Sequence, residues 1–528
     1  MTRPPAPDRP TSATPVHPMS DASDAPARDW ADGPAEGLIE GPAEGPAGAQ
    51  GGRPTSNRAP ARSQGRSQVP SQDRSQVRCQ GRSQDGAATA DDPAAAPSAT
   101  SGRAVVLLTV GALALWAAVI AVGRAWGLHL MDEGRNIVLF TPPVLGGYRP
   151  SPPPGLWGAA AVAVVLIGAL PVLARRLRWW AAVAIGAVAA IVWWVALALI
   201  DGLAGLTRGL EWKADFEAVL PGFADDPGGF LSGFTSSIKG YSIQIRGHPP
   251  GLPLVLTAMH RIGLRGPGWA AALCLLSAAL GVVAVLVTVR RVAGEARARQ
   301  AIPFLALAPA AIWIGVSFDA LYIGPAAWCV ALLVMALDTP GRRSAAFAVA
   351  GGVLAAVTAM LSYGLVLVAC IPVAVACARH RWKPLVIGAA TAVAVVLAFV
   401  PLGFWWFAGL KATHEEYYVL DLDRPYWFFL VNNVAAWALC LGPATFVALG
   451  RLRDRRLWLL VGGGLAAVAL AGLSGLSMGE VERIWLPFTL WVLPAGAVLF
   501  TRRRATTAWL AVQAATALLL TALISTNW

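Results

Sequence analysis

The stretch RRLRWWAAVAIGAVAAIVWWVALALID, residues 175–201, decides the fold class. Its apolar part, residues 179–200, is long enough to cross about 30 Å of hydrocarbon as a helix. Comparable apolar runs recur from Ala104 to the C-terminus, and the 528-residue chain is 56% apolar and only 14% charged. Soluble domains carry about 25% charged residues. The sequence therefore predicts a polytopic membrane protein.

The apolar runs also predict how the chain crosses the membrane. They are continuous rather than alternating, which excludes a β-barrel and favours an all-α transmembrane bundle. We predict about thirteen spans. They are placed at residues 104–124, 157–174, 179–200, 268–289, 301–318, 321–338, 345–361, 363–378, 384–407, 428–450, 457–476, 484–501 and 507–526.

Short basic connections set the predicted orientation. They are RRLR (175–178), RRVAGEARAR (290–299), GRR (341–343), RHRWK (379–383), RLRDRR (451–456) and RRR (502–504). All fall on one side of the membrane under this count, and positive residues in short loops mark the cytoplasm. We therefore expect a cell-membrane protein with a cytoplasmic N-terminus and an extracytoplasmic Trp528. The net charge of +12 then reflects topology rather than nucleic-acid binding.

The N-terminal segment, residues 1–102, differs in composition from the rest. It is rich in Pro, Ala, Gly, Ser, Asp and Arg, and it contains low-complexity repeats such as RSQGRSQVPSQDRSQ (62–76). Such a segment cannot bury enough apolar surface to offset its chain entropy. We predict a disordered cytoplasmic tail at 1–102, followed by one transmembrane domain at 103–528.

One predicted outer loop, residues 201–267, is much longer than the others. Within it the apolar stretch 251–264 is bounded by Pro and Gly and is too short to span the membrane. A segment of this length is expected to lie along the interface as a helix. This placement also keeps every later basic connection on the cytoplasmic side. The loop is therefore predicted to form juxtamembrane helices.

Three ionisable residues of this loop are candidate functional groups. Asp201 stands at the outer end of the third span, where partial desolvation would make it a better base than a free aspartate. Arg246 and His248 precede Pro249 and Pro250, which are expected to hold them in extended backbone. Arginine is suited to bidentate phosphate binding.

Further candidates lie nearby on the predicted outer side. The segment SMGEVERIWLPF (477–488) places Glu480 and Arg483 at the outer mouth between two late spans, and Tyr241 begins the stretch that contains Arg246. Carboxylates and cations close to lipid suit an enzyme that acts on a lipid-linked phosphate. Such a reaction needs a base for the acceptor hydroxyl and cations for the leaving phosphate.

The chain resembles the GT-C superfamily of polyprenyl-phosphate-sugar glycosyltransferases, which includes the dolichyl-phosphate-mannose protein mannosyltransferases and the aminoarabinose transferases. The resemblance rests on the many spans, the long outer loop with an acid near its start, HPPG (248–251) before an apolar segment, and EVERIWLPF (480–488). It implies an enzyme that moves a hexosyl or pentosyl group from a polyprenyl-phosphate donor to an extracytoplasmic glycan, lipid or protein acceptor. The implied mechanism is an inverting displacement.

The resemblance also implies roles for individual residues. Asp201 would be the general base, and Arg246 or His248 would face the lipid phosphate. Glu480 and Arg483 would line the donor pocket. Apart from the resemblance, Tyr241 is predicted as a further substrate-binding residue.

The chain departs from the family pattern in one respect. The family usually places its acidic motif after the first span, which makes Asp132 and Glu133 alternatives to Asp201 as the base. Asp215 and Glu217, in the long loop, are further alternatives. Some superfamily members use a divalent metal, and no redox cofactor is implied. The rival hypotheses are a membrane transporter or lipid flippase and a non-catalytic membrane scaffold.

Overall fold

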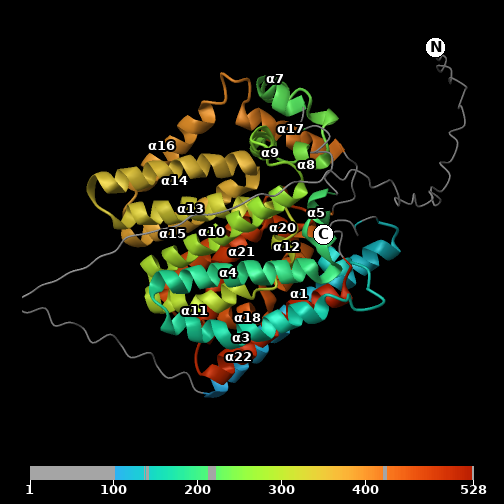
Figure 1. Ribbon diagram of the computed structural model, residues 1–528, viewed down its shortest axis with the longest axis vertical. Coiled ribbons are helices and arrows are strands. Elements are labelled where there is room, and N and C mark those ends of the chain that lie inside the picture. Colours follow the sequence, from blue (N-terminus) through green and yellow to red (C-terminus); the bar gives the residue numbers. More distant parts are fainter. Residues whose placement is uncertain are drawn as a thin grey trace, which may run out of the picture. The chain divides into compact units, whose positions relative to one another are not determined.

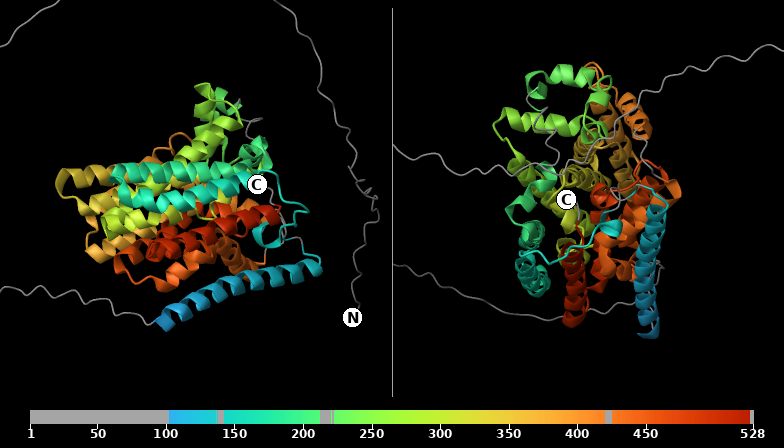
Figure 2. Two further views of the ribbon diagram at one scale, coloured as in Figure 1. Left: turned by 60° about the horizontal axis from the view of Figure 1, so that its bottom comes forward. Right: turned by 90° about the vertical axis from the view of Figure 1, so that its right-hand side faces the viewer.

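The computed structural model describes residues 102–135, 137, 142–211, 220, 222–419 and 425–525. These residues form an all-α bundle, and the only β-type contact among them is an isolated bridge between Tyr148 and Ile524. Figures 1 and 2 show long helices packed side by side, with shorter helices gathered beyond one end of the bundle. Residues 1–101 of the predicted disordered tail lie outside the described residues.

Nine helices of the described part are long and apolar enough to cross a membrane, which makes this a multi-pass membrane protein. They are α1 (Gly102–Asp132), α3 (Leu156–Arg176), α4 (Trp179–Ala198, extended by the 3₁₀ turn Leu199–Asp201), α10 (Pro267–Ala293), α13 (Asp319–Asp338), α14 (Gly341–Leu361), α18 (Tyr426–Arg451), α19 (Arg455–Leu473) and α22 (Arg503–Leu523). Each coincides with one of the predicted spans.

Three further predicted spans are shorter apolar helices. They are Tyr363–Arg379, which combines the 3₁₀ helix η5 (Tyr363–Ala369) with α15 (Cys370–Arg379), then α16 (Lys383–Leu397), and finally Leu486–Leu499, which combines α21 (Leu486–Val492) with η6 (Leu493–Leu499). All-helical spans satisfy their backbone groups internally, as the hydrocarbon requires.

The predicted span at 301–318 is interrupted. The chain forms α11 (Glu295–Ala306) and the short α12 (Ala311–Ile314) instead of one continuous helix. Proline removes a helical donor and clashes with the preceding turn, and Pro309 stands in the gap. The backbone N–H of Ala310 donates to the carbonyl of Cys440 in α18 at 2.9 Å. This contact satisfies a backbone group that the break leaves without an intrahelical partner.

Small residues allow close helix contacts within the bundle. Helices α10, α13, α14 and α16 pack in sequence, and α1 packs along α18. At Gly352 of α14, an added Cβ would lie 2.3 Å from the carbonyl oxygen of Gly388 in α16. Side chains larger than hydrogen are therefore excluded at this contact, as is common where membrane helices approach closely.

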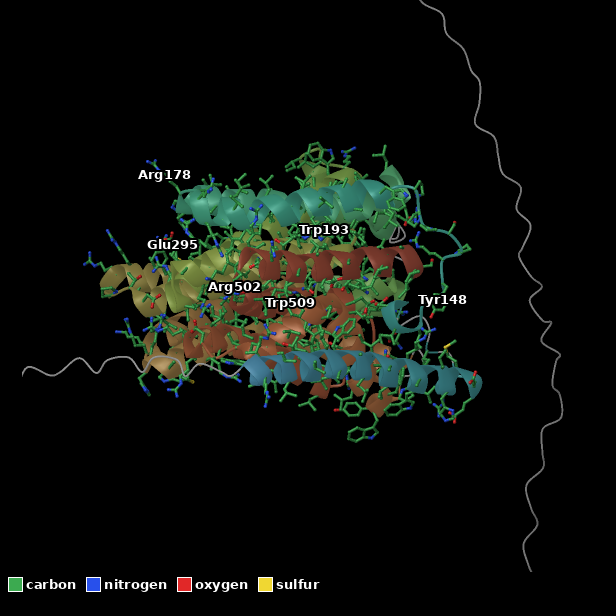
Figure 3. All side chains as sticks on the ribbon, turned by 90° about the horizontal axis from the view of Figure 1, so that it is seen from below. Tyr148, Arg178, Trp193, Glu295, Arg502 and Trp509 are labelled. Atoms are coloured by element: carbon green, nitrogen blue, oxygen red, sulfur yellow. The ribbon has the colours of Figure 1, made fainter. Side chains whose placement is uncertain are left out.

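The predicted basic connections meet at one end of the bundle. Arg299 donates to the carbonyls of Ala174 and Leu177, and Arg297 pairs with Asp454. Figure 3 shows Arg178 and Glu295 at this end and Tyr148 at the other. We call the first the basic end and the second the site end.

Short helices form the long loop at the site end. They are η2 (Leu199–Asp201), η3 (Leu203–Leu206), α5 (Arg208–Glu211), α7 (Pro227–Gly233), η4 (Ile238–Gly240), α8 (Ile243–Arg246) and α9 (Gly251–Arg261). In Figure 1, α9 is seen end-on where α13 and α14 are seen from the side, so α9 lies crosswise to the spans. Juxtamembrane helices were predicted for this loop, and α9 matches the predicted interfacial segment. An added Cβ at Gly251 would meet the Met360 carbonyl, so this glycine seats α9 on α14.

Candidate functional site

Asp201 is fixed by the end of the third span. The helix α4 tightens into the 3₁₀ turn Leu199–Asp201, and Gly202 then adopts a positive φ of 82° that ends the turn. The carboxylate of Asp201 accepts two hydrogen bonds from the guanidinium of Arg149, at 2.8 and 2.9 Å. This is the bidentate geometry in which an arginine binds a carboxylate most strongly.

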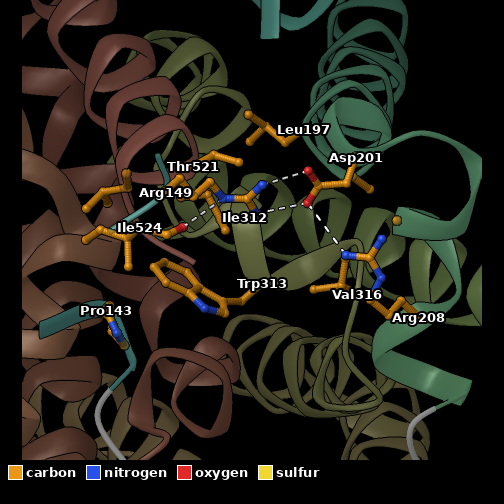
Figure 4. A pocket seen from close by; sticks show the side chains of 13 residues that line it. Pro143, Arg149, Leu197, Asp201, Arg208, Ile312, Trp313, Val316, Thr521 and Ile524 are labelled. Atoms are coloured by element: carbon orange, nitrogen blue, oxygen red, sulfur yellow. Dashed lines mark hydrogen bonds and ion pairs between the residues drawn. The ribbon is translucent and has the colours of Figure 1, made fainter. Parts of the chain in front are cut away.

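A second arginine approaches the same carboxylate. Nη1 of Arg208, on α5, lies 3.8 Å from an Asp201 oxygen. Figure 4 shows Arg149 and Arg208 on either side of Asp201 at the wall of a cavity. Other lining residues are Pro143, Leu197, Ala198, Gly205, Ile312, Trp313, Val316, Leu520, Thr521 and Ile524. Two guanidinium groups and one carboxylate leave this wall with one net positive charge.

The expectation that Asp201 is a stronger base than a free aspartate is wrong for this geometry. That expectation rested on desolvation of the carboxylate at the helix end. The two hydrogen bonds from Arg149 instead stabilise the charged form and occupy one lone pair on each carboxylate oxygen. The pairing with Arg149 therefore makes Asp201 a weaker base than an unpaired aspartate.

Arg149 was not among the predicted site residues. It lies between α2 (Pro142–Leu145) and α3, where its N–H donates to the Leu523 carbonyl at 2.9 Å and its Nε to the Ile524 carbonyl at 3.3 Å. These bonds tie the connection to the end of α22. A signal was present in the sequence, because Arg149 is an arginine on the predicted outer side, where the topology rule leaves few of them.

Arg483 forms the centre of a second charged group. It belongs to α20 (Val481–Ile484), and its guanidinium donates to Asp319 Oδ2 at 2.6 Å and to Glu480. The hydroxyl of Ser317 donates to the same Asp319 oxygen at 2.8 Å. The side chains of Arg483 and Asp319 are each only 4% exposed. The predicted pair Glu480 and Arg483 is thus found together, but the two bind each other and Asp319.

Glu482 lies beside this group and is fully buried. Neither of its carboxylate oxygens has a hydrogen-bond partner among the described residues. Burial raises the pKa of Glu482 to about 8, and the nearby Glu480 carboxylate adds to the effect. The site end therefore holds a carboxyl that carries a proton at neutral pH.

His248 faces the same region from the long loop. Its ring centroid lies 6.1 Å from that of Tyr322, one turn along α13 from Asp319. The turn 315–318 connects this second group with the first. Val316 lines the Asp201 cavity, whereas Ser317 contacts Asp319. The two groups thus lie on either side of one short turn.

Arg246 lies in a third group. It ends the short helix α8, so the prediction of extended backbone at this position is wrong. Proline restricts only the residue directly before it, and the Arg246 N–H is free to donate to the Ser242 carbonyl at 3.0 Å. Nη1 of Arg246 lies 3.6 Å from a carboxylate oxygen of Glu416, which belongs to α17 (Trp406–Val419). The hydroxyl of Thr413, also in α17, donates to the backbone carbonyl of Arg246 at 2.8 Å.

Tyr241 is part of an aromatic cluster. Its ring stacks on Phe234 with centroids 5.7 Å apart and meets Phe223 and Phe230 edge-on at 5.8 and 5.9 Å. This cluster is the apolar core of the juxtamembrane helices. None of the described contacts of Tyr241 joins it to the charged groups above.

The alternative bases have different surroundings. Asp132 and Glu133 are exposed at the end of α1, where Glu133 lies 3.4 Å from His129. Asp215 and Glu217 lie outside the described residues. Of the acids that the structure describes, Asp201 is the candidate base that lines a cavity together with two arginines.

A divalent metal was a further option. Within the described residues, no group of three or more His, Cys, Asp or Glu side chains is placed to hold a metal ion. The Asp201 cavity contributes one carboxylate and two cations, which is a poor ligand set for a hard cation. The residues that line this cavity therefore do not fit a resident divalent metal.

The chain was compared with protein families, with curated proteins and with solved structures, and only solved structures gave matches. No protein-family model and no curated protein matches the sequence. Two solved structures do, both of ArnT from Cupriavidus metallidurans, at 16% identity. The apo structure has a TM-score of 0.33 over 52% of this chain and 54% of ArnT. The structure bound to undecaprenyl phosphate has a TM-score of 0.31 over 56% of this chain and 60% of ArnT.

The match spans less than two thirds of ArnT. A likeness of this size shows neither a shared activity nor shared functional residues. The function of this chain must therefore be inferred from its own charged groups.

Proposed function

We propose that this protein is an integral membrane glycosyltransferase that takes a sugar from a polyprenyl-phosphate donor and transfers it to an extracytoplasmic acceptor. The observation that carries the proposal is the cavity wall on which Asp201 lies between Arg149 and Arg208. A carboxylate between two guanidinium groups, at the end of membrane-spanning helices, provides both a base and a phosphate-binding pair. The sequence resemblance to GT-C enzymes supports the same reaction.

The proposed reaction begins with an exchange of partners. The donor phosphate binds Arg149 and Arg208, whose net positive charge with Asp201 matches an anionic ligand. Arg149 thereby leaves Asp201, and the free carboxylate accepts the proton of the acceptor hydroxyl. The hydroxyl oxygen attacks the anomeric carbon from the face opposite the phosphate. The bond from that carbon to the phosphate oxygen breaks, and polyprenyl phosphate leaves with the electron pair.

The second and third charged groups have supporting roles in this proposal. His248, Glu480 and Arg483 line the region beyond the turn 315–318, where the sugar or the acceptor would be bound. Arg246 holds α8 against α17 and so positions the loop that carries His248. Tyr241 acts through the aromatic cluster that supports this loop.

We also propose an orientation. The basic end faces the cytoplasm, because short basic connections are retained there. The Asp201 cavity then opens on the extracytoplasmic side of the cell membrane. Nucleotide-activated sugars are not generally present on that side, which favours a lipid-linked donor.

The test is transfer of labelled sugar by the purified protein in proteoliposomes. A panel of polyprenyl-phosphate sugars is offered with a mixed envelope-glycan acceptor. We expect transfer by the natural sequence, a loss of about 10²–10⁴-fold in Asp201→Asn, and full transfer in the matched control Asp132→Asn. Full transfer activity in Asp201→Asn would show that Asp201 is not the base. Loss of transfer in Asp132→Asn alone would identify Asp132 as the base instead.

A further inference from the structure

The basic end contains a pocket that the proposed reaction does not use. It lies between the start of α14 and the α15–α16 turn, and we call it the α14–α16 pocket. Its lining residues are Gly341, Ser344, Ala345, His380, Arg381, Trp382, Lys383, Pro384 and Ile387. His380, Arg381, Trp382 and Lys383 are all exposed. Three basic side chains and one tryptophan thus surround one concave site.

The pocket has a surplus of positive charge. The connections 338–343 and 379–383 contain five arginines and lysines and a single acid, Asp338. That acid already pairs with Arg379. Arg381 is held in place by donating to the Leu337 carbonyl at 2.6 Å. No acid of the described residues lies within salt-bridge distance of Lys383. Asp338 also interacts with Arg381 through its charge, so this single acid compensates only part of the positive charge around the pocket.

The backbone adds to this potential. Helices α14 and α16 both begin at the pocket, and their contact at Gly352 and Gly388 keeps them close along their length. Neither helix has a side chain that caps its first turn. The first N–H groups of a helix favour negative charge. They supplement the basic side chains that line the pocket.

Both helices that begin at the pocket carry exposed apolar side chains further along. Val349 and Val353 of α14 and Val386 and Val393 of α16 are 44%, 39%, 64% and 57% exposed. In a membrane protein such residues face hydrocarbon chains. Trp382, 48% exposed beside the pocket, is of the type that concentrates at the membrane–water interface. A ligand of this site would have an anionic head and apolar tails.

We propose that the α14–α16 pocket binds the headgroup of an anionic phospholipid, with the acyl chains along the exposed faces of α14 and α16. The basic charge, the concave shape and the exposed apolar side chains of the two helices match this ligand together. Basic pockets between membrane helices on the cytoplasmic side are suited to anionic headgroups. The site lies at the opposite end of the bundle from Asp201 and does not depend on the proposed transfer reaction.

The experiment is native mass spectrometry of the full-length protein released from detergent, with phosphatidylglycerol or phosphatidylcholine added. We expect phosphatidylglycerol to bind preferentially. The double variant Arg381→Gln, Lys383→Gln should lower its affinity by roughly five- to thirtyfold. The matched control is Arg502→Gln, Arg503→Gln, which removes two arginines from the start of α22 on the same basic end and should leave the affinity unchanged.

Three outcomes would overturn the proposal. An equal loss of phosphatidylglycerol affinity in both double variants would show that surface charge in general, and not the pocket, attracts the lipid. Equal binding of the two lipids would show that the headgroup charge is not recognised. Because Arg381 also bonds the end of α13, a second pair, Lys383→Glu and Arg503→Glu, repeats the comparison without touching Arg381. Displacement of phosphatidylglycerol by millimolar inorganic phosphate alone would identify an anion site without lipid selectivity, and would also overturn it.

Discussion

Two hydrogen bonds of 2.8 and 2.9 Å join Arg149, which follows the first span, to Asp201, which ends the third. With Arg208 at 3.8 Å, the carboxylate is held by two cations at a cavity wall. This pairing makes a donor-free Asp201 a poor base and makes the arginines available only in competition with it. The proposed reaction therefore couples donor binding to release of the base.

The coupling predicts opposite effects of one substitution on binding and on transfer. In Asp201→Asn the arginines lose their charged partner, so the affinity for undecaprenyl phosphate should rise by about fivefold. Sugar transfer should fall by about 10²–10⁴-fold, because the amide cannot take the acceptor proton. Binding is measured by native mass spectrometry and transfer in proteoliposomes. Loss of both properties together would indicate a structural role for Asp201 and would count against the exchange of partners.

A second prediction concerns the ion pair between Arg246 and Glu416. The Glu416 side chain is 8% exposed and that of Arg246 16%. Removing one partner of a buried pair leaves the other charge unpaired, so Glu416→Gln should lower the free energy of unfolding by about 3 kcal/mol. Its neighbour Glu415 is 60% exposed and pairs with the exposed Lys411. Glu415→Gln is the matched control and should change stability by less than about 0.5 kcal/mol.

Thermal unfolding in detergent measures the stability of both variants relative to the natural sequence. The Arg246→Ala variant and the double variant Arg246→Ala, Glu416→Gln complete the cycle. If the pair holds α8 against α17, the double variant should be little less stable than either single variant. Additive losses would mean that the two residues act independently. Unchanged affinity of Arg246→Ala for undecaprenyl phosphate would confine Arg246 to this positioning role.

A third prediction follows from the buried carboxyl of Glu482, whose pKa is raised to about 8 by burial. The unfolded chain releases this proton near pH 4.5, whereas the folded protein keeps it to about pH 8. Between these values the folded state binds more protons, so stability falls as pH rises. We expect the apparent melting temperature to decrease from pH 5 to pH 8. The decrease should be smaller in Glu482→Gln than in the natural sequence and in the exposed-site control Glu133→Gln.

A fourth prediction concerns the contact between α14 and α16. In Gly352→Ala the new Cβ would lie 2.3 Å from the Gly388 carbonyl oxygen, so the helices must move apart. We expect a loss of about 1–3 kcal/mol of stability. At Gly111 of α1 an added Cβ would have no atom within 4 Å, and Gly111→Ala is the control. Equal melting temperatures for the two variants would contradict the close packing at Gly352.

Much of this fold was predictable from the sequence, because the membrane imposes few solutions. Runs of about 20 apolar residues must be helices, and the basic connections between them gave the two ends of the bundle. The break near Pro309 was harder to predict. An uncharged apolar run of this length is predicted as one spanning helix, even where a proline divides it into α11 and α12.

The site was less predictable than the fold, because pairing between distant segments leaves no local pattern. Asp201, Glu480 and Arg483 were recognised by their positions at helix ends. Their partners Arg149 and Asp319 come from connections far away in the sequence. The expected strength of Asp201 as a base was wrong for this reason, since one unseen arginine reverses the effect of desolvation.

The most direct test of the proposed phosphate site is the affinity of the purified protein for undecaprenyl phosphate in the natural sequence and in Arg149→Gln. We predict that Arg149→Gln lowers the affinity at least tenfold, because the phosphate loses its bidentate partner. The control Arg265→Gln removes an exposed arginine that donates to the His260 carbonyl, and this variant should bind as the natural sequence does. Equal affinity in Arg149→Gln and the natural sequence would contradict the assignment of this cavity to the lipid phosphate.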